Sequence, residues 1–240
     1  MSHAAAESLQ QWWTDAGVDT LVGEIPRDWL RAAEKPVQAS GPSPSGAPAA
    51  PAAEAELPGQ LNLFQAWLQS SETLSFAAPA APRVCPSGDP AAGLMILTDM
   101  PAAEDCASGN LLSGRAGRLF DRMLAAIGRD RASIYLAAMS CLRAPSGRLT
   151  GEPAQRCATL ARHHLGLAAP RAVLILGDDA ARALLGLGVT EGRGRWHEVQ
   201  THSGPIRALV SLSPDHLLLH PRHKAAAWAD LQMLAEGLNG

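Results

Sequence analysis

A carboxylate and a glycine-led helix follow one apolar stretch of the chain in an order that suits ligand binding. Residues 94–97 (LMIL) are apolar and β-prone, Asp99 and Pro101 follow in a small-residue loop, and Gly114 begins a helical pattern. In α/β proteins, a strand that leads through such a loop to a helix N-terminus forms a crevice for anionic or nucleotide ligands. An ordinary strand-to-helix connection has the same pattern, so this alternative stays open.

Three histidines near the C-terminal end have a spacing that a metal site could use. His216 and His220 are four residues apart, which can place two imidazoles on one helical face, and His223 follows. Pro221 interrupts such a helix. We therefore expect a solvated loop here and no metal.

Alternating apolar runs and helical patterns position these groups. Strands are expected at residues 94–97, 134–138, 173–176 and 208–212, and helices at 114–127, 153–167, 178–187 and 222–238. This alternation predicts an α/β fold: a three-layer α/β/α sandwich around a central, mainly parallel four-stranded sheet. A ligand should bind at the carboxyl ends of the strands.

The first ninety residues have a different organisation. Residues 1–35 are expected to form a helical segment, in which Trp12 and Trp13 either dock on a partner or cover a neighbouring apolar surface. Residues 36–59 are rich in Pro and Ala and read as a flexible linker. The folded domain is expected at residues 90–240.

A short motif follows the linker, within residues 60–69. Gln60, Leu61, Leu63 and Phe64 resemble the QLxLF peptide with which bacterial replication and repair proteins bind the sliding clamp. In such a peptide, Leu and Phe fill an apolar pocket and the Gln amide fixes the orientation. The alternative is that Leu61, Phe64 and Leu68 form the buried stripe of an amphipathic helix.

Charge and cysteine content narrow the class of protein. The chain carries 20 Lys and Arg against 23 Asp and Glu, but residues 94–240 are mildly basic, with 16 basic and 13 acidic side chains. A mildly basic domain permits phosphate contact. The 4 cysteines and the absence of an apolar run of about 18 residues indicate a cytoplasmic protein that does not span a membrane.

Several blocks of residues 94–240 resemble the uracil-DNA glycosylases of the bacterial and archaeal thermostable class, family 4. The family's strand, GEAPG, GxPFVGRAG and LLDxML sequence is echoed by LMIL, TDMPA (98–102), GNLLSGRAG (109–117) and LFDRML (119–124). Further similar blocks are IYL (134–136), PRAVLILG (170–177) and the segment from Pro214 to Leu234. The resemblance implies a glycosylase-like fold and DNA as partner.

The same resemblance implies that most of the excision chemistry has changed. Asp99 stands where the family has an acidic residue that orients or activates water. Leu112 replaces the Phe that stacks on the flipped base, and Ala138 replaces the Asn that reads the uracil edge. Ser213 replaces the His that supports the developing negative charge.

The remaining positions carried over are contacts to base and DNA. Pro101 belongs to the implied base pocket together with Leu112 and Ala138. The implied DNA contacts are Ser113, Gly114, Arg115 and Pro214.

Family members of this class hold an iron–sulfur cluster with four cysteines. Cys157 aligns with one ligand position, but Leu142 occupies another, with Cys141 one residue away. Cys85 falls on an apolar family position, and no Cys pair precedes Leu94. We therefore expect no cluster, no other cofactor, and cysteines that act as small buried hydrophobes.

Two functions remain open. The first is a uracil-DNA glycosylase-like repair protein with weak or altered base excision through Asp99 and Ser213. The second is a catalytically inactive adaptor that binds DNA, the sliding clamp or both. In either case a monomer is expected.

Overall fold

The structure is a computed structural model that describes residues 57–71, 74 and 81–239. The chain divides into two units, Met1–Ala53 and Glu54–Gly240, and every described residue belongs to the second. The expected segment 1–35 and residues 36–56 of the expected linker lie outside the described residues.

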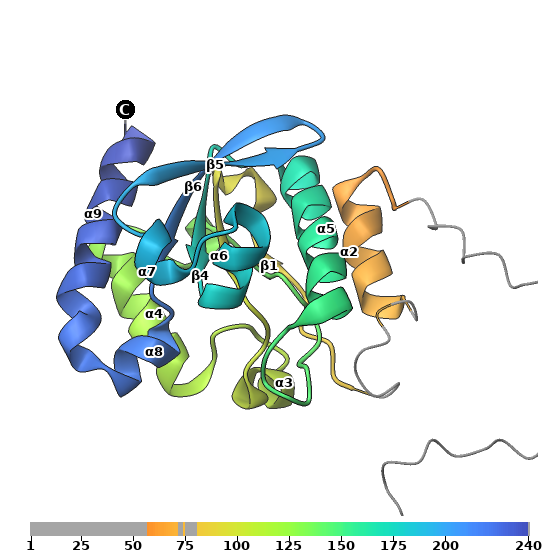
Figure 1. Ribbon diagram of the computed structural model, residues 1–240, viewed down its shortest axis with the longest axis horizontal. Helices are drawn as coiled ribbons and strands as arrows, with labels where there is room; N and C mark the ends of the chain where they lie inside the picture. Colours follow the sequence, from red (N-terminus) through yellow and green to blue (C-terminus); the bar gives the residue numbers. More distant parts are fainter. Residues whose placement is uncertain (1–56, 72–73, 75–80, 240) are drawn as a thin grey trace, which may run out of the picture. The chain divides into compact units, whose positions relative to one another are not determined.

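Helices and strands alternate along the described unit (Figure 1). The strands are β1 (Ser87–Gly88), β2 (Leu94–Thr98), β3 (Tyr135–Ala138), β4 (Ala172–Leu176), β5 (Trp196–Thr201) and β6 (Gly204–Ser211). The α-helices are α2 (Leu61–Ser70), α3 (Ala103–Ser108), α4 (Gly114–Ala126), α5 (Gly151–Ala168), α6 (Asp178–Leu185), α7 (Val189–Gly192), α8 (Pro214–Leu219) and α9 (Lys224–Asn239). Three short 3-10 helices are η1 (Pro90–Ala92), η2 (Arg131–Ser133) and η3 (Pro221–His223).

The sheet has the strand order β1-β3-β2-β4-β6-β5. The four central strands are parallel, with Ile96 of β2 between Leu136 of β3 and Leu174 of β4. These four strands confirm the expected parallel core. The expected strand count was too low, because β1 and β5 pair antiparallel at the two edges.

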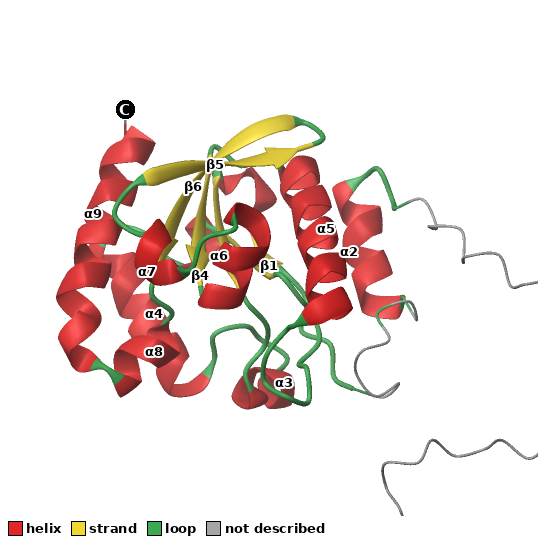
Figure 2. Ribbon diagram, in the orientation of Figure 1, coloured by secondary structure: helices red, strands yellow, loops and turns green. Residues whose placement is uncertain are grey.

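Helices cover both faces of this sheet (Figure 2). Met95 and Leu97 point to the face covered by α5 and α6, whereas Leu94 and Ile96 point to the face covered by α4 and α9. Every residue of β2 and β4 is buried, as expected for strands covered on both sides. The three-layer α/β/α architecture is thus confirmed.

Local signals explain where several helices differ from expectation. The helix expected at 178–187 ends at Leu185 because Gly186 takes a left-handed conformation with φ +73°. Residues 104 and 105 belong to the helix α3, where no helix was expected. Pro221 separates α8 from α9, as its ring predicts.

The topology places a crevice at the carboxyl ends of β2 and β4. The chain passes from β2 to β3 on one side and later returns to β4 on the other side. Connections that leave a parallel sheet in opposite directions open a space at this switch point.

Candidate functional site

Asp99 follows β2 and directs its carboxylate to the start of α6. Its Oδ1 accepts a hydrogen bond from the backbone N–H of Ala180 at 2.7 Å, and its backbone carbonyl accepts one from Ser140 at 3.1 Å. Gly177 makes room for this carboxylate, since a Cβ there would lie 2.2 Å from Oδ2 of Asp99. Asp99 therefore holds the N-terminus of a helix.

The surroundings of Asp99 change its acidity. Burial raises its pKa to about 6, the backbone N–H of Ala180 lowers it, and the nearby Asp179 raises it. At neutral pH the group is a carboxylate and can accept a proton. One of its oxygens is already engaged by the helix.

Ser213 is likewise occupied by a helix. Its Oγ accepts a hydrogen bond from the backbone N–H of His216 at 3.3 Å, and Pro214 occupies the first position of α8. This is the usual N-cap arrangement for a serine. The structure thus gives this hydroxyl a structural partner.

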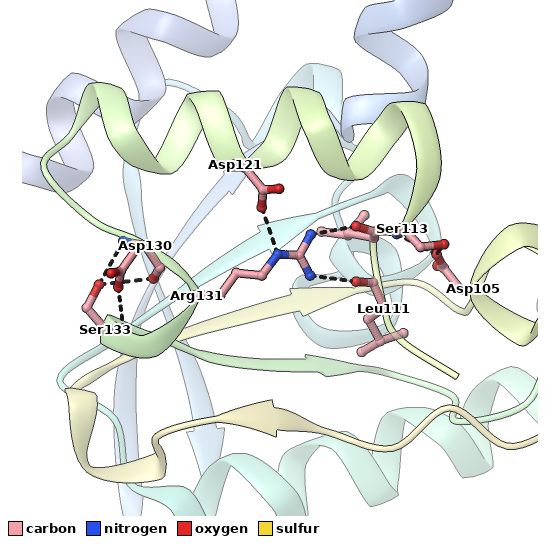
Figure 3. Close-up of polar contacts among 8 residues, drawn as sticks. Asp105, Leu111, Ser113, Asp121, Asp130, Arg131 and Ser133 are labelled. Carbon is pink, nitrogen blue, oxygen red and sulfur yellow. Dashed lines mark hydrogen bonds and ion pairs between the residues drawn. The ribbon is translucent and has the colours of Figure 1, made fainter. Parts of the chain in front are cut away.

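The loop before α4 is held from two sides (Figure 3). Arg131 donates hydrogen bonds to the carbonyls of Leu111 at 2.9 Å and Leu112 at 2.6 Å, and it forms an ion pair with Asp121 at 2.7 Å. Leu112 needs this support because its φ is +49°, an uncommon value for a non-glycine residue. Its buried side chain offers apolar contact to a ligand.

Asp105 fixes the other end of that loop. Its carboxylate accepts hydrogen bonds from the backbone N–H and the hydroxyl of Ser113, at 2.7 and 2.6 Å, and from the N–H of Ala102 at 3.0 Å. Ser113, an implied phosphate contact, therefore has both donors engaged by a buried carboxylate. Gly114 has φ +59°, and a Cβ there would lie 1.6 Å from Oε2 of Glu104.

A pocket of about 370 Å³ lies beside this loop. Its lining comprises Ala102, Ala103, Glu104, Asp105, Leu112, Ser113, Arg115, Ala116, Asp215, Leu218 and Leu219. Three carboxylates thus face one guanidinium. The pKa of Asp215 is raised by burial and by the neighbouring Asp105 and Glu104, and is lowered by Arg143.

The structure brings together only part of the set of site residues inferred from sequence. Leu112, Ser113 and Arg115 share the pocket. Its lining does not include Pro101, Asp99, Ala138, Gly114, Ser213 and Pro214. Three of the residues inferred from sequence thus lie in one pocket, whereas Asp99 and Ser213, the groups proposed for chemistry, are not part of its lining.

Sequence inference did not single out Asp105 or Arg131 as site residues. An Asp at the third position of a helix is a known sign of a carboxylate that reaches back to the helix start, and Asp105 has this position. No comparable local sign marks Arg131, whose acceptors lie 19 and 20 residues away.

The three C-terminal histidines contact one another. Nε2 of His216 lies 2.8 Å from Nδ1 of His223, and the ring centroids of His216 and His220 are 4.6 Å apart. Burial and the two neighbouring imidazoles lower the pKa of His216. Within residues 57–71, 74 and 81–239, no three His, Cys, Asp or Glu side chains converge to hold a metal ion.

All four cysteines are free thiols, and Cys141 and Cys157 are buried. Burial raises the thiol pKa of Cys141 and of Cys157 to about 11, so both favour the neutral form in this structure. Cys141 packs with Phe64, Leu68 and Leu142 in an apolar cluster. Leu142, at a ligand position of family 4, offers no thiolate, and the absence of a cluster stays a prediction.

The QLNLF motif lies at the start of α2. Gln60 is exposed and Leu63 is 52% exposed, whereas Phe64 is only 1% exposed. The Phe64 ring packs against His163 and His164 of α5, at centroid distances of 5.1 and 5.2 Å. The described conformation is therefore the helical alternative, and Phe64 is not available to a partner in it.

Comparisons with known proteins agree with the expected fold. The model of the Uracil DNA glycosylase superfamily matches residues 85–232. A type-4 uracil-DNA glycosylase of Archaeoglobus fulgidus is 23% identical over 156 residues, which cover 62% of this chain and 78% of that protein. A type-4 uracil-DNA glycosylase of Pyrobaculum aerophilum is 23% identical over 157 residues, covering 62% and 80%. Among the described residues, no helix is long and apolar enough to cross a membrane.

Proposed function

The chain belongs to the uracil-DNA glycosylase superfamily, and we propose that it is a DNA-binding repair protein whose base excision is weak. The observation that carries this proposal is that Asp99 and Ser213 already have hydrogen-bond partners within the protein. Both groups accept hydrogen bonds from helix N-termini, and neither lines the pocket beside Leu112. Residues proposed to bind DNA line this pocket, whereas the two groups proposed for base excision do not.

Weak excision would depend on Asp99. Above pH about 6 its carboxylate is ionised, and Oδ2 remains free of the hydrogen bond that Ala180 donates to Oδ1. It can then orient or deprotonate a water molecule. The departing base receives little help, because loss of one oxyanion donor typically raises the barrier by about 2.7 to 4 kcal/mol.

A single-turnover assay tests this proposal. Protein in excess is incubated with uracil- or hypoxanthine-containing DNA, single- and double-stranded, and abasic product is measured. The matched control is Asp99→Asn, which keeps an acceptor for Ala180 but cannot take a proton. Slow product formation that Asp99→Asn abolishes is expected, and product from Asp99→Asn at the wild-type rate would remove Asp99 from the mechanism.

The second candidate function is a DNA-binding adaptor without excision. Ala138 favours it, because a methyl group at the end of β3 can neither donate nor accept a hydrogen bond to a base edge. Absence of product at stoichiometric protein, with DNA binding intact, would support the adaptor and overturn weak excision.

The sliding clamp is the adaptor's proposed second partner, through Gln60 to Phe64. Because Phe64 is buried against α5, clamp binding requires α2 to detach. Clamp pull-down with Gln60→Ala and Phe64→Ala tests this step. Clamp binding that both variants leave unchanged would exclude the motif.

We also propose that the protein holds no iron–sulfur cluster. It is supported by the buried neutral thiols of Cys141 and Cys157. We expect the purified protein to be colourless, and iron with sulfide bound in stoichiometric amount would contradict this.

A further inference from the structure

Three arginines form one exposed face of α4. Arg115, Arg118 and Arg122 follow one another at spacings of three and four residues, which places them on the same side of a helix. All three are exposed, and none has an ion pair or side-chain hydrogen bond with another described residue. Asp121, the acidic residue of α4, is paired with Arg131. Arg115 shares its pocket with three carboxylates, whereas Arg118 and Arg122 have no ion-pair partner among the described residues.

The arginine row joins the pocket beside Leu112 to a second hollow. Arg115 lines the pocket beside Leu112, and Arg122 lines a groove of about 190 Å³ between α4 and α9. These helices lie side by side on one face of the sheet (Figure 1). The groove is lined by Leu119, Arg122, Met123, Ala126, Leu217, Lys224, Ala227, Trp228 and Leu231. Its lining contains two cations and no carboxylate.

Trp228 adds an aromatic surface to the groove. Its side chain is 42% exposed, although most large apolar side chains of the described unit are buried. Proteins that bind single-stranded nucleic acid combine a cationic groove along the backbone with aromatic side chains on which bases stack. Arg122, Lys224 and Trp228 provide both elements within one groove.

We propose that the groove between α4 and α9 binds single-stranded DNA that continues from the pocket beside Leu112. Arg118, Arg122 and Lys224 contact its phosphates, and Trp228 stacks on a base. This inference rests on the proposed DNA binding and assigns it a path. An acidic protein would also match the cations, but the exposed ring of Trp228 within the same groove favours a strand with unstacked bases.

Fluorescence anisotropy of full-length protein with a labelled 20-nucleotide oligothymidylate tests the path. The double variant Arg118→Ala/Arg122→Ala should bind about tenfold more weakly. The slope of log K against the logarithm of the salt concentration should become shallower by about 0.7 for each lost phosphate contact. The matched control is Arg156→Ala/Arg195→Ala, which removes two exposed arginines outside the groove and should change affinity far less.

Two substitutions of Trp228 separate stacking from a structural role. Trp228→Ala should weaken binding about tenfold, within the range for loss of one stacked base. Trp228→Phe keeps an aromatic ring and should retain most of the affinity. Thermal unfolding of each variant establishes that it is folded.

The outcomes distinguish this inference from the proposed function. If the wild type binds no DNA, DNA binding itself fails. If it binds but the arginine double variant binds equally well, only the path along α4 is overturned. If a polyglutamate peptide binds more tightly than the oligothymidylate and the double variant loses that binding, the groove is a protein interface and the DNA path is overturned.

Discussion

The pocket beside Leu112 and the exposed face of α4 differ in whether their charged side chains are hydrogen-bonded within the protein. In the pocket, the Asp105 carboxylate accepts hydrogen bonds from Ser113 and Ala102. Outside the pocket, the Asp99 carboxylate accepts a hydrogen bond from Ala180. On α4, Arg118 and Arg122 have no polar partner among the described residues. Groups bonded within the protein stabilise it, whereas unpaired exposed cations remain available to a ligand. The contrast supports the proposal of a protein that binds DNA but excises bases weakly.

Of the predicted losses in the free energy of unfolding, the one caused by substitution of Gly177 should be the largest. Gly177→Ala places a methyl group against the Asp99 carboxylate at a residue with φ +144°. We expect a loss of roughly 3 kcal/mol or more in the free energy of unfolding, measured with urea. The control Gly186→Ala also has positive φ but meets no atom within 4 Å, so its loss should be clearly smaller. Equal losses would show that Asp99 does not fill the space beside Gly177.

The pH dependence of stability tests the burial of Asp99. Its pKa is about 6 in the folded protein against an ordinary value of 3.8, so folding favours the protonated form. This stabilisation is complete below pH about 4 and is lost as the pH rises through about 6. Relative to Asp99→Asn, the wild type should lose on the order of 2 kcal/mol across this window. A stability difference that does not vary with pH would contradict the raised pKa.

Arg131 and Arg118 give a direct comparison of a bonded and an unbonded arginine. Arg131→Ala leaves the carbonyls of Leu111 and Leu112 without their donor, which should cost about 1.5 kcal/mol in urea unfolding. Arg118→Ala should change stability by less than about 0.5 kcal/mol. The comparison fails if Arg118→Ala destabilises the protein as much as Arg131→Ala does.

A smaller effect than that of Arg131→Ala is expected at Ser213. Ser213→Ala removes the cap of α8 and should lower the free energy of unfolding by about 0.5 to 1 kcal/mol. Ser213→Asn restores a capping side chain and should recover most of that loss. A loss in excision rate with unchanged stability would instead place this hydroxyl in the chemistry.

Sequence indicated the elements that have strong local patterns. The buried strands β2 and β4 are continuous apolar runs, and Asp99 was correctly placed at the end of the first. The edge strand β5 was missed because Trp196, His197 and Glu198 begin a half-exposed, polar stretch without an apolar run. The strand β1 has only two residues, too few for any periodicity.

The site was harder to infer because its contacts are long-range. Asp215 and Glu104 lie 111 positions apart, and only the packing of α8 beside α4 brings both carboxylates to one pocket. The commitment of Asp99 to the N–H of Ala180 depends on the parallel pairing of β2 and β4. Family motifs aligned these residues but gave no information on their hydrogen-bond partners.

One oligonucleotide experiment tests the central claim most directly. Binding affinity and single-turnover uracil release are measured on the same single-stranded, uracil-containing DNA, with the Archaeoglobus fulgidus type-4 uracil-DNA glycosylase as reference. We predict that this protein binds the DNA but releases uracil at least about a hundredfold more slowly, as expected for loss of one oxyanion donor. Release at the rate of the reference enzyme, or absence of DNA binding, would contradict the account.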